Sequence, residues 1–274
     1  MDPLIEKGTA LITGSGSGLG QAIAVKFAAQ GCRKLYLVDL NMQGLQNTQA
    51  LVERANEHTR VVLRVVDITN SDQVKDMVQD CVNIYGRLDF AINNAGFAAG
   101  GTKTADLSIE LFDKMCNVNE KGVFLCLKYQ MAQMLKQEPL EIDSKDFEAV
   151  RGVRGSVIST GSLSTTVTLK DFSGYTSSKH GVGMMIKQAA REYAQYKIRV
   201  NAINPGAVMT PMIAASGLTK QFLDNLSSQA PMNRLILAEE VADMAVWLSS
   251  SRASAITGVL LPVDCGASLY HLES

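Results

Sequence analysis

Thr13-Gly14-Ser15-Gly16-Ser17-Gly18-Leu19-Gly20 is the most informative stretch of this sequence. It follows the aliphatic run 9–12 and precedes a helical pattern that carries Ala22, Ile23 and Phe27. Glycines let a backbone turn sharply and approach a diphosphate closely, and the N-terminus of the next helix offers free N–H groups. The stretch therefore predicts a phosphate-binding loop, although Gly-Ser runs also form plain turns and the common phosphate-loop motifs are not matched in register.

Asp39 ends the next aliphatic run, 25 residues after Gly14. A carboxylate at this position can accept hydrogen bonds from the adenosine ribose hydroxyls of a dinucleotide and would repel a 2′-phosphate. Neither Ser17, before Gly18, nor Leu40, after Asp39, is a cation that could receive such a phosphate. The sequence therefore predicts NAD rather than NADP as cofactor, the alternative being that Asp39 is an ordinary polar strand end.

Aliphatic runs alternate with stretches of helical periodicity along the chain, as in successive βα units. One helical stretch starts after Asn70 and carries apolar residues from Val74 to Tyr85 at three- and four-residue steps. We expect strands at residues 9–12, 35–38, 61–66, 90–92, 156–158, 199–203 and 259–261. The pattern predicts an α/β fold: a single doubly wound Rossmann-type domain over residues 1–274, with a seven-stranded, mostly parallel sheet and helices on both faces.

The charge balance excludes several partner classes. The chain has 26 Lys and Arg against 27 Asp and Glu, so a nucleic-acid or anionic-membrane surface is not expected. No apolar run approaches the roughly 18 residues of a membrane span, and residues 1–7 lack the apolar core of a signal peptide. The cysteines are scattered and the histidines show no ligand spacing, so neither disulfides nor a metal site is expected. We predict a soluble, cytoplasmic protein.

Two segments interrupt the βα rhythm. Residues 137–154 are charged, contain Pro139 and lie between a helix and a strand, which favours a solvated surface loop over a binding element. Residues 210–234 follow a strand end, and their apolar side chains include Met212, Leu218 and Phe222. This second segment is interpreted either as a substrate lid or as filling of the core.

Tyr175 and Lys179 form a Tyr-x-x-x-Lys pair. On a helix, side chains four residues apart share a face, and a nearby ammonium lowers the pKa of a tyrosine from its usual value of about 10. Ser162 lies 13 residues earlier, just past a predicted strand, at the sheet edge where α/β proteins place their sites. The spacing indicates a proton-transfer site, with Ser159 and Ser164 as rivals for the serine and a structural capping serine as the alternative for all three.

The ordered motifs make the chain similar, over nearly its whole length, to the compact single-domain branch of the short-chain dehydrogenase/reductase family. Thr13-Gly14-x-x-x-Gly18-x-Gly20 resembles the cofactor loop of that family, and Asn93-Asn94-Ala95-Gly96 resembles its motif after the fourth strand. Asn204-Pro205-Gly206 and Thr210 resemble its turn over the nicotinamide. One departure is Asp264-Cys265-Gly266, where the family often has Asp-Gly-Gly.

The resemblance implies two sets of site residues. The implied catalytic set comprises Asn119, Ser162, Tyr175 and Lys179. The implied cofactor-binding set comprises Gly14, Ser17, Gly18, Leu19, Gly20, Asp39, Leu40, Asp67, Ile68, Asn94, Ala95, Gly96, Tyr175, Lys179, Pro205, Gly206, Val208 and Thr210.

The same resemblance implies reversible hydride transfer between NAD (NADH) and a secondary alcohol or ketone. Tyr175 would exchange the proton, Ser162 would orient the substrate oxygen, Lys179 would hold the ribose hydroxyls, and Asn119 would continue a proton path through water. Leu163, Phe97 and the segment 210–234 suggest a mostly hydrophobic, cyclic substrate. Family members are usually homo-dimers or homo-tetramers.

Three alternatives remain open at this point. The chain could be a catalytically silent NAD-binding sensor or scaffold, although such a module has no need of the proton-handling residues. It could also be an NADP-dependent ketoreductase of specialised metabolism. The third alternative is an epimerase or dehydratase on the same cofactor fold, for which no extended substrate domain is evident.

Overall fold

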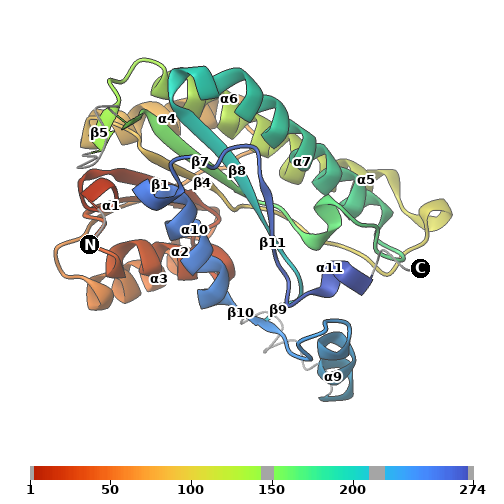
Figure 1. Ribbon diagram of the computed structural model, residues 1–274. Helices are drawn as coiled ribbons and strands as arrows, with labels where there is room; N and C mark the ends of the chain where they lie inside the picture. Colours follow the sequence, from red (N-terminus) through yellow and green to blue (C-terminus); the bar gives the residue numbers. More distant parts are fainter. Residues whose placement is uncertain (1–2, 143–150, 210–219, 271–274) are drawn as a thin grey trace.

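The computed structural model describes residues 3–142, 151–209 and 220–270 and contains a single central sheet with helices around it (Figure 1). Seven strands lie in the order β11-β8-β7-β4-β1-β2-β3, and all neighbouring pairs in this sheet are parallel. The strand order reverses between β1 and β4, and in open α/β sheets ligands bind beyond the carboxyl ends of the strands at such a point. The predicted Rossmann-type fold is confirmed.

The predicted strands differ from the observed ones by only a few residues at their ends. The sheet contains β1 (Thr9–Thr13), β2 (Lys34–Asp39), β3 (Arg60–Val65), β4 (Phe90–Asn93), β7 (Gly155–Thr160), β8 (Ile198–Pro205) and β11 (Leu260–Val263). The larger helices are α2 (Gly18–Ala29), α3 (Met42–Ala55), α4 (Ser71–Tyr85), α5 (Ile109–Met115), α6 (Gly122–Met134), α7 (Ser173–Tyr193) and α10 (Ala238–Ser249). The short helices α1 (Pro3–Lys7) and α11 (Ala267–Tyr270) lie near the two ends of the chain.

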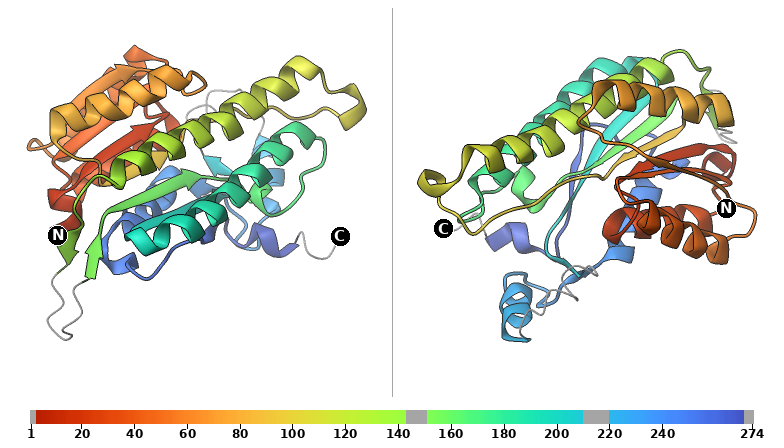
Figure 2. Two further views of the ribbon diagram at one scale, coloured as in Figure 1. Left: turned by 90° about the horizontal axis from the view of Figure 1, so that it is seen from above. Right: turned by 180° about the vertical axis from the view of Figure 1, so that it is seen from behind.

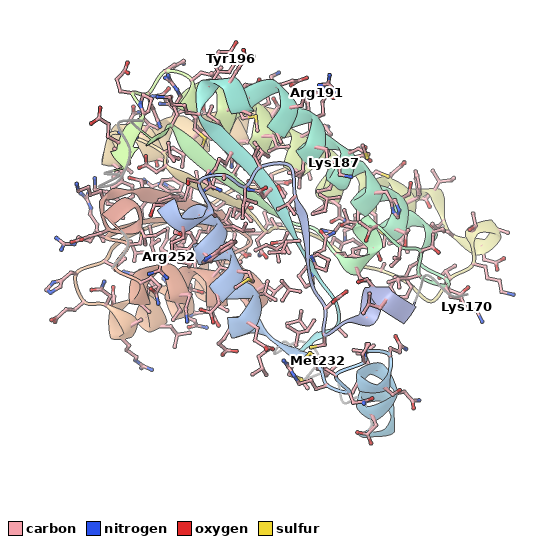
Figure 3. The ribbon with its side chains drawn as sticks, in the orientation of Figure 1. Lys170, Lys187, Arg191, Tyr196, Met232 and Arg252 are labelled. Atoms are coloured by element: carbon pink, nitrogen blue, oxygen red, sulfur yellow. The ribbon has the colours of Figure 1, made fainter. Side chains whose placement is uncertain are left out.

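The helices form one layer on each face of the sheet (Figure 2). Successive strand residues point to opposite faces, so Ile12 packs in the core beneath α2, α3 and α10, whereas Leu11 packs in the core beneath α4, α6 and α7. On α7, Lys187 and Arg191 lie on the outer surface of the layer (Figure 3). Among these helices, α3 and α4 each bury one apolar stripe, in keeping with their sequence periodicity.

The region expected to be one long helix after residue 109 contains an irregular turn. A π-helical turn, Cys116–Lys121, joins α5 to α6. Such turns have one more residue per hydrogen-bonded ring than an α-helix and are frequent at functional sites. The turn holds the buried side chain of Asn119.

The segment 137–154 is more ordered than the surface loop that its composition predicts. It contains a small antiparallel pair, β5 (Leu140–Ile142) and β6 (Arg151–Val153), on either side of residues that lie outside the described part of the chain. Alternating apolar residues at 140 and 142 are the local signal for this hairpin, which charge and Pro139 obscure.

The expected lid falls partly outside the described residues, since these resume at residue 220. There α9 (Lys220–Ser228) projects from the body of the domain, beside the short parallel pair β9 (Val208–Met209) and β10 (Ile236–Leu237) (Figure 1). Met232, between α9 and β10, is 60% exposed (Figure 3). Across the described ranges, no helix is both long and apolar enough to cross a membrane.

Candidate active site

The glycine loop joins β1 to α2 at the carboxyl edge of the sheet. Gly14 and Gly18 have φ angles of 65° and 55°, which favour glycine, and a Cβ on Gly20 would lie 2.1 Å from the Gly14 carbonyl oxygen. Ser17 is the N-cap of α2, and its side chain makes no capping hydrogen bond. The first N–H groups of this helix therefore have no side-chain cap, which fits the binding of a dinucleotide diphosphate.

Asp39 lies beside this loop at the end of β2. One carboxylate oxygen accepts a hydrogen bond from the Gly16 N–H (2.9 Å), and the other accepts one from the Asn41 N–H (3.0 Å). Its neighbour Leu40 is 68% exposed. The carboxylate is thus held beside the glycine loop, and its contact with a cofactor ribose stays a prediction.

The end of β4 is tied directly to the glycine loop. The Asn94 side chain donates to the Gly14 carbonyl (3.0 Å) and accepts from the Thr160 hydroxyl (3.0 Å). The backbone N–H groups of Asn94 and Ala95 both donate to Thr13 Oγ1 (3.2 Å each). Residues from β1, β4 and β7 are therefore held at one edge by side chains, which explains why these polar types stand there.

Asn119 is completely buried in the π-helical turn. Its amide group exchanges two hydrogen bonds with the backbone of Phe97: the Phe97 N–H donates to Oδ1 (2.7 Å), and Nδ2 donates to the Phe97 carbonyl (2.8 Å). Nδ2 also lies 3.1 Å from the Ser178 hydroxyl, which donates to the Tyr175 carbonyl. Asn119 thus fixes the loop after β4 against the helix that carries Tyr175.

Lys179 is buried on the face of α7 that points to the sheet. Its Nζ donates to the Thr160 carbonyl (2.9 Å) and lies 5.8 Å from the centre of the Tyr175 ring. Burial lowers the pKa of Lys179 to about 8. A Cβ on Gly96 would lie 3.7 Å from Nζ, an ordinary contact, and 3.3 Å from Asn119 Oδ1, a tight one, so Gly96 lies close to both groups.

The Ser162 side chain lies close enough to the Tyr175 hydroxyl to affect its pKa. Burial raises the pKa of the Tyr175 hydroxyl, and the Ser162 hydrogen bond lowers it by less. The net direction contradicts the expected lowering by Lys179, because desolvation of the phenolate is the larger effect and the ammonium is directed at Thr160. The ring of Phe172 packs edge-on against Tyr175, with centres 6.3 Å apart.

Ser162 is distinguished from its two rivals by its contacts. Its hydroxyl also accepts from the Ser164 N–H (3.1 Å), so it caps a 3-10 turn and faces Tyr175 at once. Ser159 and Ser164 are buried, and neither hydroxyl has a hydrogen-bond partner among the described residues. The capping alternative for Ser162 and its predicted catalytic role are therefore compatible.

The remaining predicted cofactor residues lie along the same edge. Asp67 accepts hydrogen bonds from the Thr69 N–H and hydroxyl. The buried Ile68 side chain lies where a Cβ on Gly122 would project. Pro205 ends β8 and Val208 begins β9, with Gly206 between them. Thr210 lies outside the described residues. The roles of all these residues stay predictions.

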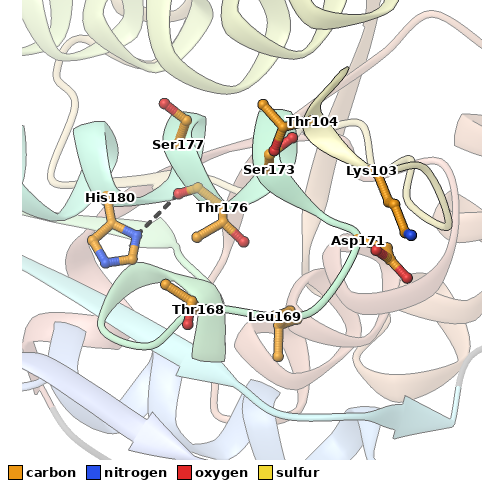
Figure 4. A pocket seen from close by; sticks show the side chains of 9 residues that line it. All are labelled: Lys103, Thr104, Thr168, Leu169, Asp171, Ser173, Thr176, Ser177 and His180. Atoms are coloured by element: carbon orange, nitrogen blue, oxygen red, sulfur yellow. Dashed lines mark hydrogen bonds between the residues drawn. The ribbon is translucent and has the colours of Figure 1, made fainter. Parts of the chain in front are cut away.

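Two hollows lie near the cluster. One, of about 780 Å³, is bounded by α7 and the loops before it, and none of the four predicted catalytic residues lines it (Figure 4). There His180 Nδ1 lies 3.0 Å from the Thr176 carbonyl. The other, of about 40 Å³, lies beside Leu163 and contains both apolar and polar groups, including Arg234 and Asp264.

Sequence reasoning missed several side chains that build the site. Thr160 holds the end of β7 to Asn94 after β4, and Ser178 links Asn119 to α7. Their hydroxyl-bearing types carry no distinguishing signal apart from their position at strand ends. Cys265 adopts a φ of 53°, in the region that favours glycine, where the family often has glycine.

No group of three or more His, Cys, Asp or Glu side chains in the described parts of the chain is arranged to hold a metal ion. The five cysteines are free thiols.

Comparison with known proteins gives matches over almost the whole chain. A family model described as enoyl-(acyl carrier protein) reductase matches residues 14–268. Levodione reductase of Leifsonia aquatica is 34% identical, covering 95% of this chain and 94% of its own. A 2,5-dichloro-2,5-cyclohexadiene-1,4-diol dehydrogenase of Sphingobium indicum is 33% identical over 94% of this chain and 96% of its own.

Solved structures agree with these relatives. The crystal structure of levodione reductase superposes with a TM-score of 0.87 at 32% identity, covering 96% of this chain and 98% of the other. A 3-ketoacyl-(acyl-carrier-protein) reductase from Brucella melitensis, solved with NADH, gives a TM-score of 0.82 at 28% identity over 96% of this chain and 99% of its own. The chain therefore belongs to the short-chain dehydrogenase/reductase family, whose members are oxidoreductases that bind a nicotinamide cofactor.

Proposed function

We propose that this protein is an NAD-dependent oxidoreductase that interconverts a secondary alcohol and a ketone on a mostly hydrophobic, cyclic small molecule. The observation that carries the proposal is the cluster of Ser162, Tyr175, Lys179 and Asn119 at the carboxyl edge of the sheet, beside an uncapped helix N-terminus. A module that only binds a nucleotide has no use for such a proton-handling group.

A bound nicotinamide supplies the hydride acceptor in alcohol oxidation and the hydride donor in ketone reduction. The chain's own part is proton transfer and orientation. In oxidation, Tyr175 takes the hydroxyl proton of the substrate, and Ser162 donates a hydrogen bond that orients the substrate oxygen. Burial raises the pKa of the Tyr175 hydroxyl, which stabilises the protonated form that donates the proton in ketone reduction.

Lys179 and Asn119 support this proton transfer. The Lys179 ammonium lies near the Tyr175 ring, and its remaining donors are free to hold the ribose hydroxyls of the cofactor. Asn119 keeps the loop that follows β4 in register with α7 and continues the proton path through water. The ammonium would stabilise the phenolate that alcohol oxidation requires.

The choice of NAD rests on Asp39. A fixed carboxylate beside the glycine loop can accept hydrogen bonds from ribose hydroxyls and repels a 2′-phosphate. Leu40 and Ser17 offer no cation in compensation. The NADH found in the Brucella structure supports this choice by similarity.

The cyclic substrate is supported by the names of two relatives, and the small hollow beside Leu163 adds apolar surface near Ser162. One relative reduces levodione, as its name states, and the other is a dehydrogenase of a cyclohexadiene diol. Leu163, Leu226 and Ile236 provide apolar surface in the small hollow, and Phe172 packs against Tyr175. Polar groups at its rim, such as Gln229, would suit a substrate with a second oxygen.

The proposal also includes that the protein forms a homo-dimer or homo-tetramer in the cytoplasm. The outer surfaces of α5, α6 and α7 expose large apolar side chains, among them Ile109 (70%), Phe124 (50%) and Met184 (62%). Exposed apolar side chains on three successive helices support association through these helices. Light scattering of the purified protein would test it, and a monomer at micromolar concentration would overturn it.

The activity is tested by following NADH absorbance with a panel of cyclic secondary alcohols and diketones, and by repeating the assay with NADP. Turnover with a cyclic alcohol or ketone and a preference for NAD are expected. Binding of NAD without turnover on any member of the panel would favour the silent sensor, and equal or better turnover with NADP would favour the NADP-dependent ketoreductase.

A further inference from the structure

Helix α3 packs directly on the glycine loop. A Cβ on Gly44, in the first turn of α3, would lie 2.6 Å from the carbonyl oxygen of Gly16 and 3.2 Å from its Cα. Contacts below 3.0 Å require the backbone to move. Gly44 has no positive φ, so its glycine is needed for this close approach and not for a turn.

Thr48, one turn further along α3, bonds to the same loop. Its side chain is completely buried, and its hydroxyl lies 2.7 Å from the Ser15 carbonyl oxygen, to which it donates. The hydroxyl also accepts from Gln21 Nε2 (2.9 Å), which comes from the first turn of α2. Thr48 therefore links the start of the loop to the helix that follows it.

The loop in turn holds Asp39. The Gly16 N–H donates to one carboxylate oxygen, and the Asn41 N–H donates to the other. The Asn41 side chain accepts from the Gly44 N–H (3.2 Å), so it caps α3. The glycine loop, the Asp39 carboxylate and the start of α3 are thus joined by hydrogen bonds. Each carboxylate oxygen of Asp39 is therefore held by a backbone N–H.

We propose that Gly44 and Thr48 are positioning residues that set the cofactor selectivity of this enzyme. They keep the Gly16 backbone pressed towards Asp39, so that the carboxylate stays at the mouth of the loop, where its charge opposes a 2′-phosphate. The inference rests on the proposed preference for NAD and extends it to two residues that need not touch the cofactor.

The test compares Gly44→Ala, Thr48→Val and Thr48→Ser with Gln46→Ala, an exposed position on the same helix. Affinity for NADH is measured by fluorescence titration, and kcat and KM are measured with NAD and NADP. Alanine ordinarily favours a helix over glycine, so a Gly44→Ala loss cannot come from helix propensity.

Gly44→Ala forces the Gly16 backbone to move, and Thr48→Val removes a hydrogen bond to the loop. We expect each to weaken NADH binding and to raise the KM for NAD roughly tenfold, the effect of about one hydrogen bond. The kcat at saturation should change by less than about twofold, and the ratio of kcat/KM between NAD and NADP should fall. Thr48→Ser keeps the hydroxyl and should restore both quantities, and Gln46→Ala should leave them unchanged.

Two results would overturn this inference and leave the proposed preference for NAD intact. In the first, the wild type is selective for NAD, but Gly44→Ala and Thr48→Val keep the wild-type NADH affinity and selectivity ratio. In the second, the variants lose activity equally with both cofactors, in proportion to a lower melting temperature. A wild type that uses NADP as well as NAD would instead overturn the proposed cofactor itself, and the selectivity argument with it.

Discussion

The amino and carboxyl ends of the parallel strands form two opposite edges of the central sheet, called here the amino edge and the carboxyl edge. Both edges carry buried polar groups of similar kinds, but the two edges differ in how completely the chain hydrogen-bonds those groups. At the amino edge, Asp89 accepts from the Thr9 N–H (2.9 Å) and from Arg87 Nε (2.7 Å). Gln137 both accepts from the Leu88 N–H and donates to the Leu88 carbonyl. The chain itself satisfies most of the hydrogen-bonding capacity at this edge, which makes it a structural edge.

The carboxyl edge keeps unused capacity. Among the described residues, the buried hydroxyls of Ser159 and Ser164 and both polar atoms of the Asn204 amide have no protein partner. The amino edge has fewer such atoms, Thr9 Oγ1 and Arg199 Nε. Since buried polar groups are ordinarily paired, the unused ones mark where the fold gives up stability to keep groups available for ligands or water.

Replacing a tyrosine by phenylalanine at each edge should give the largest difference in turnover between the two edges. Tyr175→Phe removes the hydroxyl that transfers the proton, so turnover should fall about 10³-fold, within the range of general acid–base catalysis. NADH affinity, measured by fluorescence titration, should stay within twofold. Substantial turnover by this variant would remove Tyr175 from the proposed mechanism.

The matched control is Tyr85→Phe at the amino edge. The Tyr85 hydroxyl donates to the backbone carbonyls of Leu35 and Arg60, so its loss should destabilise the fold by about 1 kcal/mol and leave kcat unchanged. A loss of turnover in this variant would show that the two edges are not separate in function.

The second prediction concerns the structural edge alone. Asp89→Ala leaves the Thr9 N–H and the Arg87 guanidinium without their acceptor and should cost about 3 kcal/mol of unfolding free energy. For a chain of this size that corresponds to a fall in Tm of roughly 6–12 °C in a calorimetric scan. The KM for NAD at 20 °C should be unchanged, and a rise in it would contradict the separation of the edges.

The third prediction concerns the free energy of unfolding that the burial of Lys179 costs at the carboxyl edge. Burial lowers the pKa of Lys179 to about 8, below its value of about 10.4 in an unfolded chain. Below pH 8 the fold must bury an ammonium, and this penalty disappears as the pH rises from 8 towards 10.5.

Lys179→Met removes the titrating group. The free energy of unfolding of the variant should therefore exceed that of the wild type most at pH 7, by about 1–3 kcal/mol, and the difference should shrink by pH 10. Paired melting curves at the two pH values check this. A difference in Tm that does not depend on pH would mean that Lys179 is not held in a destabilised state.

The smallest effect is expected at a glycine of the structural edge. Gly86 ends α4 with a φ of 86°, and a Cβ there would meet nothing within 4 Å. Gly86→Ala should thus cost only the backbone strain of about 1 kcal/mol, seen in chemical denaturation, with normal NADH binding.

Gly20→Ala at the other edge should abolish NADH binding, because its Cβ would overlap the Gly14 carbonyl.

The sequence predicts much of this molecule because its signals are local. The strands β1 and β2 follow from continuous aliphatic runs to within one residue at their carboxyl ends, and the helix α4 follows from its cap at Asn70 and its apolar stripe. The candidate site follows from ordered motifs, so Tyr175, Lys179, Ser162 and Asn119 are brought together as expected.

What the sequence does not predict depends on tertiary contacts. The π-helical turn around Asn119 exists because its amide bonds to Phe97 and approaches Ser178, residues 22 and 59 positions away. The raised pKa of Tyr175 depends on how much protein surrounds it, which the four-residue spacing from Lys179 does not reveal. The role of Thr160 likewise depends on which strands are neighbours in the sheet.

The position of β1 in the sheet also shapes how the chain reaches its fold. During synthesis β1 can pair early with β2, but its other neighbour, β4, lies about 80 positions later, as the Thr9–Asp89 contact shows. Until β4 is made, the open edge of β1 can pair with another chain. Because β7, β8 and β11 then add outward from β4, a nascent chain that stalls after β3 should be prone to aggregation.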